Sequence, residues 1–299
     1  MASVTTQPKV ARSAAGRLKQ GGVVSRTIIY IILSIWALLV ICPMLWTVMT
    51  AFKTDQEIFF SPWALPATPM IDNFTRAWTT ARIGEYLANT LLIIVPSLLL
   101  TLLLSSMAAY VLARFEFRGR GVIANMFLIG MIFPLFLALV PLYFVMQKLG
   151  LLDTYQGLIL VYVAFSLPFT IFFMTNFFRT LPRELGEAAT IDGASQYDIF
   201  FRVYLPLAQP GLITMGIFNF LGQWNQYILP NTLMITNEDT RTHYVLSQGL
   251  YYLQARQFYQ NDWSGLFAAV VIVMIPTLIV YLIFNNQIEE GMTAGSVKG

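Results

Sequence analysis

The chain has 299 residues, of which 57% are hydrophobic and only 11% are charged, and its formal net charge is +3. A soluble domain carries about 25% charged residues, so this composition excludes an ordinary soluble fold and indicates a lipid environment. The small positive charge is not gathered into a dense basic patch, so nucleic acid is not an expected partner.

Residues that carry chemistry are scarce. The single cysteine is Cys42 and the single histidine is His243, so neither an internal disulfide nor a metal-ligand cluster is expected. The sequence contains neither a phosphate-binding G-x-x-x-x-G-K-[ST] loop nor a G-x-S-x-G nucleophile elbow. We therefore predict no catalytic residues and no metal site.

Six charge-free apolar runs follow one another along the chain. Each is about 25 residues or longer, whereas a helix needs roughly 20 residues to cross the hydrocarbon core. Since backbone groups in lipid must be satisfied within their own segment, each run is predicted to be a helix. The fold class is thus an all-α integral membrane protein with six transmembrane helices. The runs are 27–52, 86–113, 121–147, 154–178, 203–237 and 263–288.

Lysine and arginine indicate the orientation of these helices. If the N-terminus is cytoplasmic, the inside segments hold 12 of the 18 basic residues and the outside loops hold 6. This asymmetry follows the positive-inside rule. It places both termini, and the segment between the fourth and fifth helices, in the cytoplasm.

That cytoplasmic segment, residues 180–206, is predicted to form two short helices. Asp192-Gly193 is a turn signal, and Ser195 with Asp198 three residues later forms a capping pattern for the second helix. The pair could lie on the membrane surface or dock a cytoplasmic protein, and the residues themselves leave both open. The apolar residues at helical spacing are Leu185, Ala188 and Ala189 in the first helix and Tyr197, Phe200, Phe201 and Tyr204 in the second.

The fifth run carries the most uncharged polar side chains, in NFLGQWNQYILP. Asn219, Gln223 and Gln226 recur at i, i+4 and i+7, which predicts one shared helical face. These amides could join helices by hydrogen bonds, or line a path for an uncharged, hydroxyl-rich solute. The candidate pathway residues are Asn219, Gln223, Trp224, Asn225 and Gln226.

The spacing in the cytoplasmic segment resembles a family motif: E-A-A, three residues, G, nine residues, then I-x-L-P. Here Glu187-Ala188-Ala189, Gly193 and Val203-Tyr204-Leu205-Pro206 fall at that spacing, with valine in place of isoleucine. The segment is therefore similar to the EAA loop of permease subunits of binding-protein-dependent ABC importers. FLGQWNQYILP resembles the fifth-helix segment of carbohydrate permeases, and the final EEGMTAGSVKG is similar to the tail of the smaller permease subunit of maltose-type transporters.

The resemblance implies a type I ABC importer permease fold with three parts. Residues 1–26 would be a cytoplasmic basic arm, residues 27–290 the six-helix permease domain with its EAA loop at 180–206, and residues 291–299 a cytoplasmic tail. The coupling core that contacts an ATPase would be Glu187, Ala188, Ala189, Asp192 and Gly193.

The resemblance also implies partners. These are a second permease that completes a heterodimer, two ATPase subunits, an extracytoplasmic sugar-binding protein and membrane lipid. The chain itself would bind no cofactor, because ATP and Mg²⁺ belong to the ATPase. It would be a non-enzymatic, multi-pass protein of the plasma or inner membrane.

Two alternatives remain at this stage. A permease of the same class could carry a different small polar solute, although the charge-free runs argue against charged cargo. A membrane-bound transferase would need a catalytic arrangement of carboxylates, whereas only dispersed ones occur.

Overall fold

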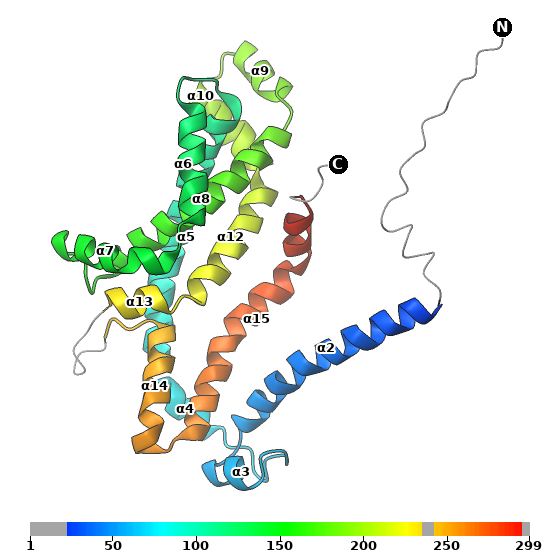
Figure 1. Ribbon diagram of the computed structural model, residues 1–299, viewed down its shortest axis with the longest axis vertical. Coiled ribbons are helices and arrows are strands. Elements are labelled where there is room, and N and C mark those ends of the chain that lie inside the picture. Colours follow the sequence, from blue (N-terminus) through cyan, green and yellow to red (C-terminus); the bar gives the residue numbers. More distant parts are fainter. Residues whose placement is uncertain (1–22, 235–241, 295–299) are drawn as a thin grey trace.

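The computed structural model describes residues 23–234 and 242–294, and all regular secondary structure within them is helical (Figure 1). Residues 1–22 and 295–299, which make up most of the predicted arm and tail, lie outside the described residues. The long helices are α2 (Val23–Thr50), α5 (Ile83–Arg114), α8 (Tyr155–Thr180) and α15 (Trp263–Ala294). The others are α3 (Asp55–Phe60), α4 (Asp72–Thr79), α6 (Arg120–Ile132), α7 (Leu135–Lys148), α9 (Glu184–Ile191), α10 (Gln196–Asp198), η1 (Ile199–Tyr204), α11 (Leu205–Leu207), α12 (Gln209–Trp224), α13 (Ile228–Leu233) and α14 (Leu246–Gln260).

Four of these helices are long and apolar enough to cross a membrane: α2, α5, α8 and α15. The bent pair of α6 and α7 makes a fifth if the two count as one span. The prediction of an all-α membrane protein is therefore confirmed, whereas the count of six crossings stays a prediction. Two of the six predicted runs differ from single straight helices.

The third predicted run is two helices, not one. α6 and α7 meet at an angle of 103°. The break falls at Phe133, whose backbone leaves the helical region (φ −67°, ψ 121°) directly before Pro134. A proline ring crowds the preceding residue and pushes it towards the extended conformation, so the helix ends there. Prolines that lie inside α2, α5, α8 and α15 do not end those helices.

The fifth predicted run is also divided. Its central piece, α12, has 16 residues, fewer than the roughly 20 that a straight crossing needs. It is preceded by the π-helical turn η1 and the short α11, and the helical path ends at Trp224. Pro206 and Pro210 lie within α11 and the first turn of α12, respectively, where a missing backbone donor costs least.

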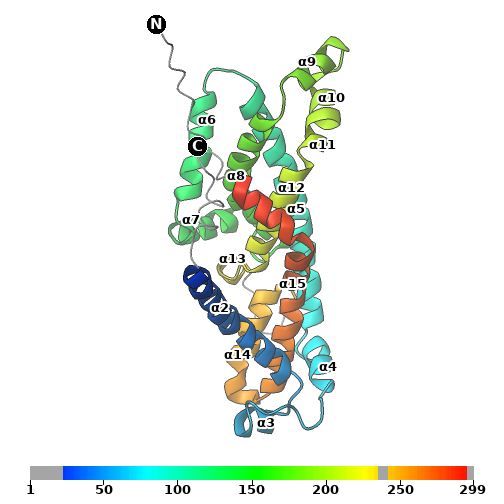
Figure 2. The ribbon, with the colours of Figure 1, turned by 90° about the vertical axis from the view of Figure 1, so that its right-hand side faces the viewer.

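The bundle is organised around α5 and α8, which pack along each other; α12 packs against both of them, and α15 packs against α12. Figures 1 and 2 place α9 at one end of this elongated bundle and α3 at the opposite end. α2 contacts α15 but diverges from the bundle (Figure 1), and none of its apolar window is buried. Such a helix, with large apolar side chains on every face, requires lipid or another membrane protein around it.

Two hydrophobic clusters form the core. The larger joins α5, α8, α14 and α15 in the middle and at the α3 end, around Tyr86, Ile93, Leu158 and Trp224. The smaller lies directly beneath α9, around Tyr110, Phe178, Phe200 and Tyr204. α14 was not predicted, because its segment was assigned to a loop, yet Leu246, Leu250 and Leu253 pack into the larger cluster at i, i+4 and i+7.

A compact lobe at the α3 end ties the end of α2 to the start of α15. Lys53 is fully buried, and its Nζ donates to the carbonyl oxygens of Ser61 and Pro62 at 2.9 Å each. Asn73 is also buried, and its Nδ2 donates to the carbonyl oxygens of Ala51 (2.9 Å) and Lys53 (2.8 Å). Arg76 reaches Asp262 at 3.0 Å across the lobe. In this lobe, the side chains of Lys53 and Asn73 thus donate to carbonyl groups that lie beyond the ends of α2 and α3.

Asn73→Ala should lower the free energy of unfolding by about 1–3 kcal/mol, since it leaves two buried carbonyl groups without their donor. Thermal unfolding of the detergent-solubilised protein would measure this. Thr68→Ala, at an exposed position of the same lobe, is the matched control and should change little. Equal effects of the two substitutions would contradict the role given to Asn73.

Candidate functional site

The segment that the sequence singled out is a helical hairpin at one end of the bundle. α9 ends in a turn in which Gly193 adopts a left-handed conformation (φ +82°). The amide of Gly193 donates to the carbonyl of Thr190 and that of Ala194 donates to Ala189, both at 3.0 Å. This pair of bonds is a Schellman motif, which requires a residue with positive φ and therefore favours glycine. The predicted turn at Asp192-Gly193 is present.

The second leg of the hairpin begins at Ser195, as the capping pattern predicted. The Ser195 Oγ accepts a hydrogen bond from the backbone N–H of Asp198. The Ser195 hydroxyl, followed by the charge of Arg202, lowers the pKa of Asp198 below its ordinary value. The carboxylate is therefore charged at neutral pH, which suits the first turn of a helix.

The tip of α9 is bare. Glu187, Ala188 and Asp192 are exposed, and the Ile191 side chain is 86% exposed. Leu185 is also exposed, so of the three residues predicted as an apolar face only Ala189 packs against the cluster beneath α9. A row of exposed apolar and acidic groups at the end of a helix is a surface that this chain alone leaves uncovered.

The base of the hairpin, in contrast, is packed. Phe200 and Tyr204 are buried, whereas Phe201 and Tyr197 remain exposed. The predicted aromatic face is divided because residues 199–204 form a π-helix, whose wider turn changes which side chains share a face. The Tyr204 ring lies against Gly186, where an added Cβ would come within 2.7 Å of the Tyr204 hydroxyl oxygen. The hairpin is thus fixed at its base.

A second group of polar residues forms a seam between α12 and its neighbours. Asn219 Nδ2 donates to Thr170 Oγ1 at 2.9 Å, and Gln223 Nε2 donates to Ser166 Oγ at 3.1 Å, both on α8. Ser97 on α5 donates its hydroxyl to Gln223 Oε1. These partners were not predicted, although Ser166 and Thr170 recur at i, i+4 within an apolar run. The seam satisfies the polar groups of three helices at once.

The five candidate pathway residues separate into two sets. Asn219, Gln223 and Trp224 are buried within the chain. Asn225 is exposed, and Gln226 is partly exposed. Because α12 ends at Trp224, Gln226 does not share a helical face with Asn219 and Gln223, which corrects the predicted i, i+4, i+7 arrangement.

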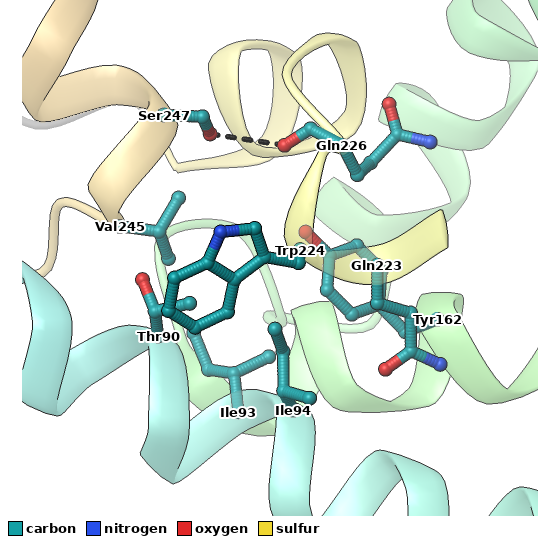
Figure 3. Close-up of a pocket in the computed structure, with 9 residues that line it drawn as sticks. All are labelled: Thr90, Ile93, Ile94, Tyr162, Gln223, Trp224, Gln226, Val245 and Ser247. Carbon is teal, nitrogen blue, oxygen red and sulfur yellow. Dashed lines mark hydrogen bonds between the residues drawn. The ribbon is translucent and has the colours of Figure 1, made fainter. Parts of the chain in front are cut away.

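Trp224 occupies the core where α12 ends (Figure 3). Its indole packs against Phe220, with ring centroids 5.3 Å apart, and lines a cavity with Ile93 and Ile94 of α5 and Val245. The cavity volume is about 10 Å³, room for about one water molecule and far below the roughly 300–1,000 Å³ of small-molecule sites. On the opposite wall, the Gln226 carbonyl accepts a hydrogen bond from Ser247 Oγ at 2.9 Å. The position of Trp224 is that of a packing residue.

No group of three potential metal ligands occurs among the described residues. What these residues do assemble is an apolar bundle, an internally bonded polar seam and a terminal hairpin with an exposed tip. This is the architecture of a helical membrane protein. The chain belongs to the family of binding-protein-dependent transport system inner membrane components, whose family model matches residues 101–294. It is therefore a transport permease of the inner membrane and not an enzyme.

Relatives span nearly the whole chain. The diacetylchitobiose uptake system permease protein of Streptomyces coelicolor is 46% identical over 290 residues, which cover 97% of this chain and 93% of that protein. The trehalose transport system permease protein of Mycobacterium tuberculosis is 31% identical over 257 residues, covering 86% and 92%.

A solved structure has the same fold. It is a crystal structure of a bacterial ABC transporter involved in import of the acidic polysaccharide alginate. The TM-score is 0.75 with 23% sequence identity, covering 93% of this chain and 99% of that chain. At this identity the match concerns the fold alone.

Gln223→Leu should destabilise the bundle by about 0.6–2 kcal/mol, since it removes hydrogen bonds to two neighbouring helices. Asn225→Leu is the matched control, because within the described part of the chain the Asn225 side chain bonds only to the Leu221 carbonyl in the preceding turn, at 2.9 Å. Unfolding by a denaturing detergent would measure both variants. If Asn225→Leu proves as damaging as Gln223→Leu, the seam does not hold α12 in place.

Proposed function

We propose that this chain is a transmembrane permease subunit of an ATP-driven carbohydrate importer and forms half of its translocation pore. The observation that carries the proposal is the 46% identity, over 97% of the chain, to a permease named for diacetylchitobiose uptake. Other relatives are named for trehalose and for arabinooligosaccharides. The substrate class is therefore a carbohydrate, and diacetylchitobiose is the first one to test.

The proposed topology has six crossings, with both termini in the cytoplasm. The bent pair α6–α7 counts as the third crossing and the path through η1, α11 and α12 as the fifth. The distribution of lysine and arginine supports this orientation. The division into an arm at 1–26, a permease domain at 27–290 and a tail at 291–299 belongs to the same proposal. The junction between arm and domain, at 26–27, would lie inside α2, and the junction between domain and tail, at 290–291, would lie inside α15.

In this orientation α9 faces the cytoplasm and docks on an ATPase subunit. The contact residues would be Glu187, Ala188, Ala189, Asp192 and Gly193. Three features support this: the position of α9 at one end of the bundle (Figure 2), the exposed apolar and acidic side chains at its tip, and the family to which the chain belongs. ATP and Mg²⁺ would bind the ATPase, so this chain would need no cofactor of its own.

The remaining partners would be a second permease, a second ATPase and an extracytoplasmic binding protein. None of the apolar window of α2 is buried, and among the described side chains of α6 and α7 only Met146 is. These helices leave ample apolar area for a second permease and for lipid. Within the pore, the solute would pass the open side of the α12 end, near Asn225 and Gln226. Asn219, Gln223 and Trp224 would form the supporting wall, since their side chains are engaged inside the chain.

ATP-driven uptake of labelled diacetylchitobiose into proteoliposomes should require all components together: this chain, its partner permease, the ATPase and the binding protein. An amino acid offered at the same concentration should not accumulate. Accumulation of the amino acid, with no accumulation of any oligosaccharide, would favour the same class of permease with a different solute.

Glu187→Lys and Gly193→Arg should each lower the amount of ATPase that co-purifies with the permease by about tenfold, because they place a positive charge on the proposed contact surface. Glu187→Lys should not reduce the amount of protein in the membrane, since Glu187 is exposed. At Gly193 an added Cβ meets nothing within 4 Å, but arginine strains the left-handed turn (φ +82°) by about 1–2 kcal/mol. The ATPase that co-purifies with each variant is therefore measured relative to the amount of that variant in the membrane. Glu116→Lys, an equal charge reversal at an exposed position between α5 and α6, is the control and should leave co-purification unchanged. Normal association of both α9 variants would contradict the docking surface.

A further inference from the structure

Arg114, the last residue of α5, holds the end of α8. Its Nη2 donates to the carbonyl oxygens of Phe178 and Leu181, at 2.8 Å each. The last carbonyl groups of a helix lack intrahelical donors, and for Phe178 the residue four positions later is Pro182, which has no N–H. Within the backbone the Phe178 carbonyl accepts a bond from the Leu181 N–H at 3.3 Å, and Arg114 adds a shorter, charged donor.

The same guanidinium group also contacts the second leg of the hairpin. The Cζ of Arg114 lies 4.4 Å from the ring centroid of Tyr204, a cation–π contact. The Tyr204 side chain is only 3% exposed, and its hydroxyl donates to the Pro182 carbonyl at 3.3 Å. Arg114 and Tyr204 together therefore join the chain entering α9, at 181–182, to the chain leaving it, at η1.

α9 rests directly on this pair. Gly186, in the first turns of α9, lies so close to Tyr204 that an added Cβ would be 3.0 Å from the ring atom Cε2. Tyr110, one turn before Arg114, packs against Tyr204 with ring centroids 5.4 Å apart and donates its hydroxyl to Gln196 at 3.3 Å. The proposed ATPase-contacting helix, α9, is therefore connected to the membrane helices through the side chains of Tyr110, Arg114 and Tyr204.

We infer that Arg114 is the positioning residue through which a displacement of α9 reaches the membrane helices. α5 ends at Arg114, α8 ends at the carbonyls that Arg114 holds, and η1 leads through α11 into α12. If this residue is lost, the hairpin remains connected by its flanking chain, by apolar contacts and by the two tyrosine hydrogen bonds of 3.3 Å. A displacement of α9 is then transmitted to the bundle less completely. The inference rests on the proposed docking of α9 and adds to it the path by which the docking acts.

The competing explanation is that Arg114 contributes only positive charge to the cytoplasmic side. A substitution at Arg118 distinguishes the contact role of Arg114 from a role of its charge alone. Arg118 lies four residues away, is exposed, and has no hydrogen bond among the described residues. Arg118→Gln removes the same charge but leaves the contacts of Arg114 intact. Arg114→Lys keeps the charge but cannot reproduce a planar group that donates to two carbonyls while stacking on a ring.

The test uses the complete transporter in proteoliposomes and measures carbohydrate transported per ATP hydrolysed, together with the amount of co-purified ATPase. Arg114→Gln should keep the ATPase bound and hydrolysing, yet lower the transport per ATP by about tenfold, which is the size of a typical coupling effect. Arg114→Lys should fall between Arg114→Gln and the unsubstituted protein, and Arg118→Gln should match the unsubstituted protein.

Substitutions at Tyr204 provide an independent measurement if Arg114→Gln does not accumulate in the membrane. Tyr204→Phe keeps the ring that Arg114 stacks on and should retain coupling, whereas Tyr204→Leu removes it and should uncouple. Unchanged transport per ATP in Arg114→Gln, an equal loss in Arg118→Gln, or equal behaviour of Tyr204→Phe and Tyr204→Leu would overturn the inference. Failure of Glu187→Lys to weaken ATPase binding would instead overturn the docking of α9, so the two failures can be told apart.

Discussion

The constraint on which the rest of this structure depends is that backbone polar groups in hydrocarbon must be satisfied within the chain. It makes the spans helical, and it confines charged residues to the ends of the bundle, where water is available. It also explains the side-chain bonds described above. Where a helix must end or break, a side chain takes the place of the missing backbone donor, as Arg114 does for Phe178 and Leu181 and as Lys53 and Asn73 do at the opposite end.

The same constraint governs the polar seam. An uncharged amide inside a membrane bundle is tolerated when a neighbouring helix accepts and donates in return. Gln223 meets this condition twice, through Ser97 and Ser166. Its bonds are therefore committed to structure, whereas Asn225 and Gln226, beyond the end of the helix, are exposed and partly exposed, respectively. All of these side chains are amides, but the end of α12 separates the buried pair, Asn219 and Gln223, from Asn225 and Gln226.

Local signals in the sequence were enough to predict the hairpin. The left-handed glycine at Gly193 and the cap at Ser195 depend on neighbouring residues only, so their pattern can be read directly. The bend between α6 and α7 was not predicted, because nothing in the local sequence distinguishes Pro134 from the prolines that lie inside α2, α5, α8 and α15. Likewise, the π-helical turn at η1 and the hydroxyl partners of Gln223 follow from contacts between segments far apart in the chain. α14 was missed for a different reason, since its apolar spacing was present in the sequence but stood among turn-forming and polar residues.

The contrast between the base and the tip of the hairpin has an energetic consequence. Ile191 at the tip is almost fully exposed, whereas Tyr204 at the base is almost fully buried. Apolar surface exposed to water costs about 25 cal/mol per Å², so covering the tip releases free energy. A segment that is already ordered loses little conformational entropy when it binds. A packed base with an exposed apolar tip therefore suits the proposed docking on an ATPase. In that proposal, the packed base would also carry a displacement of the tip to the helices below.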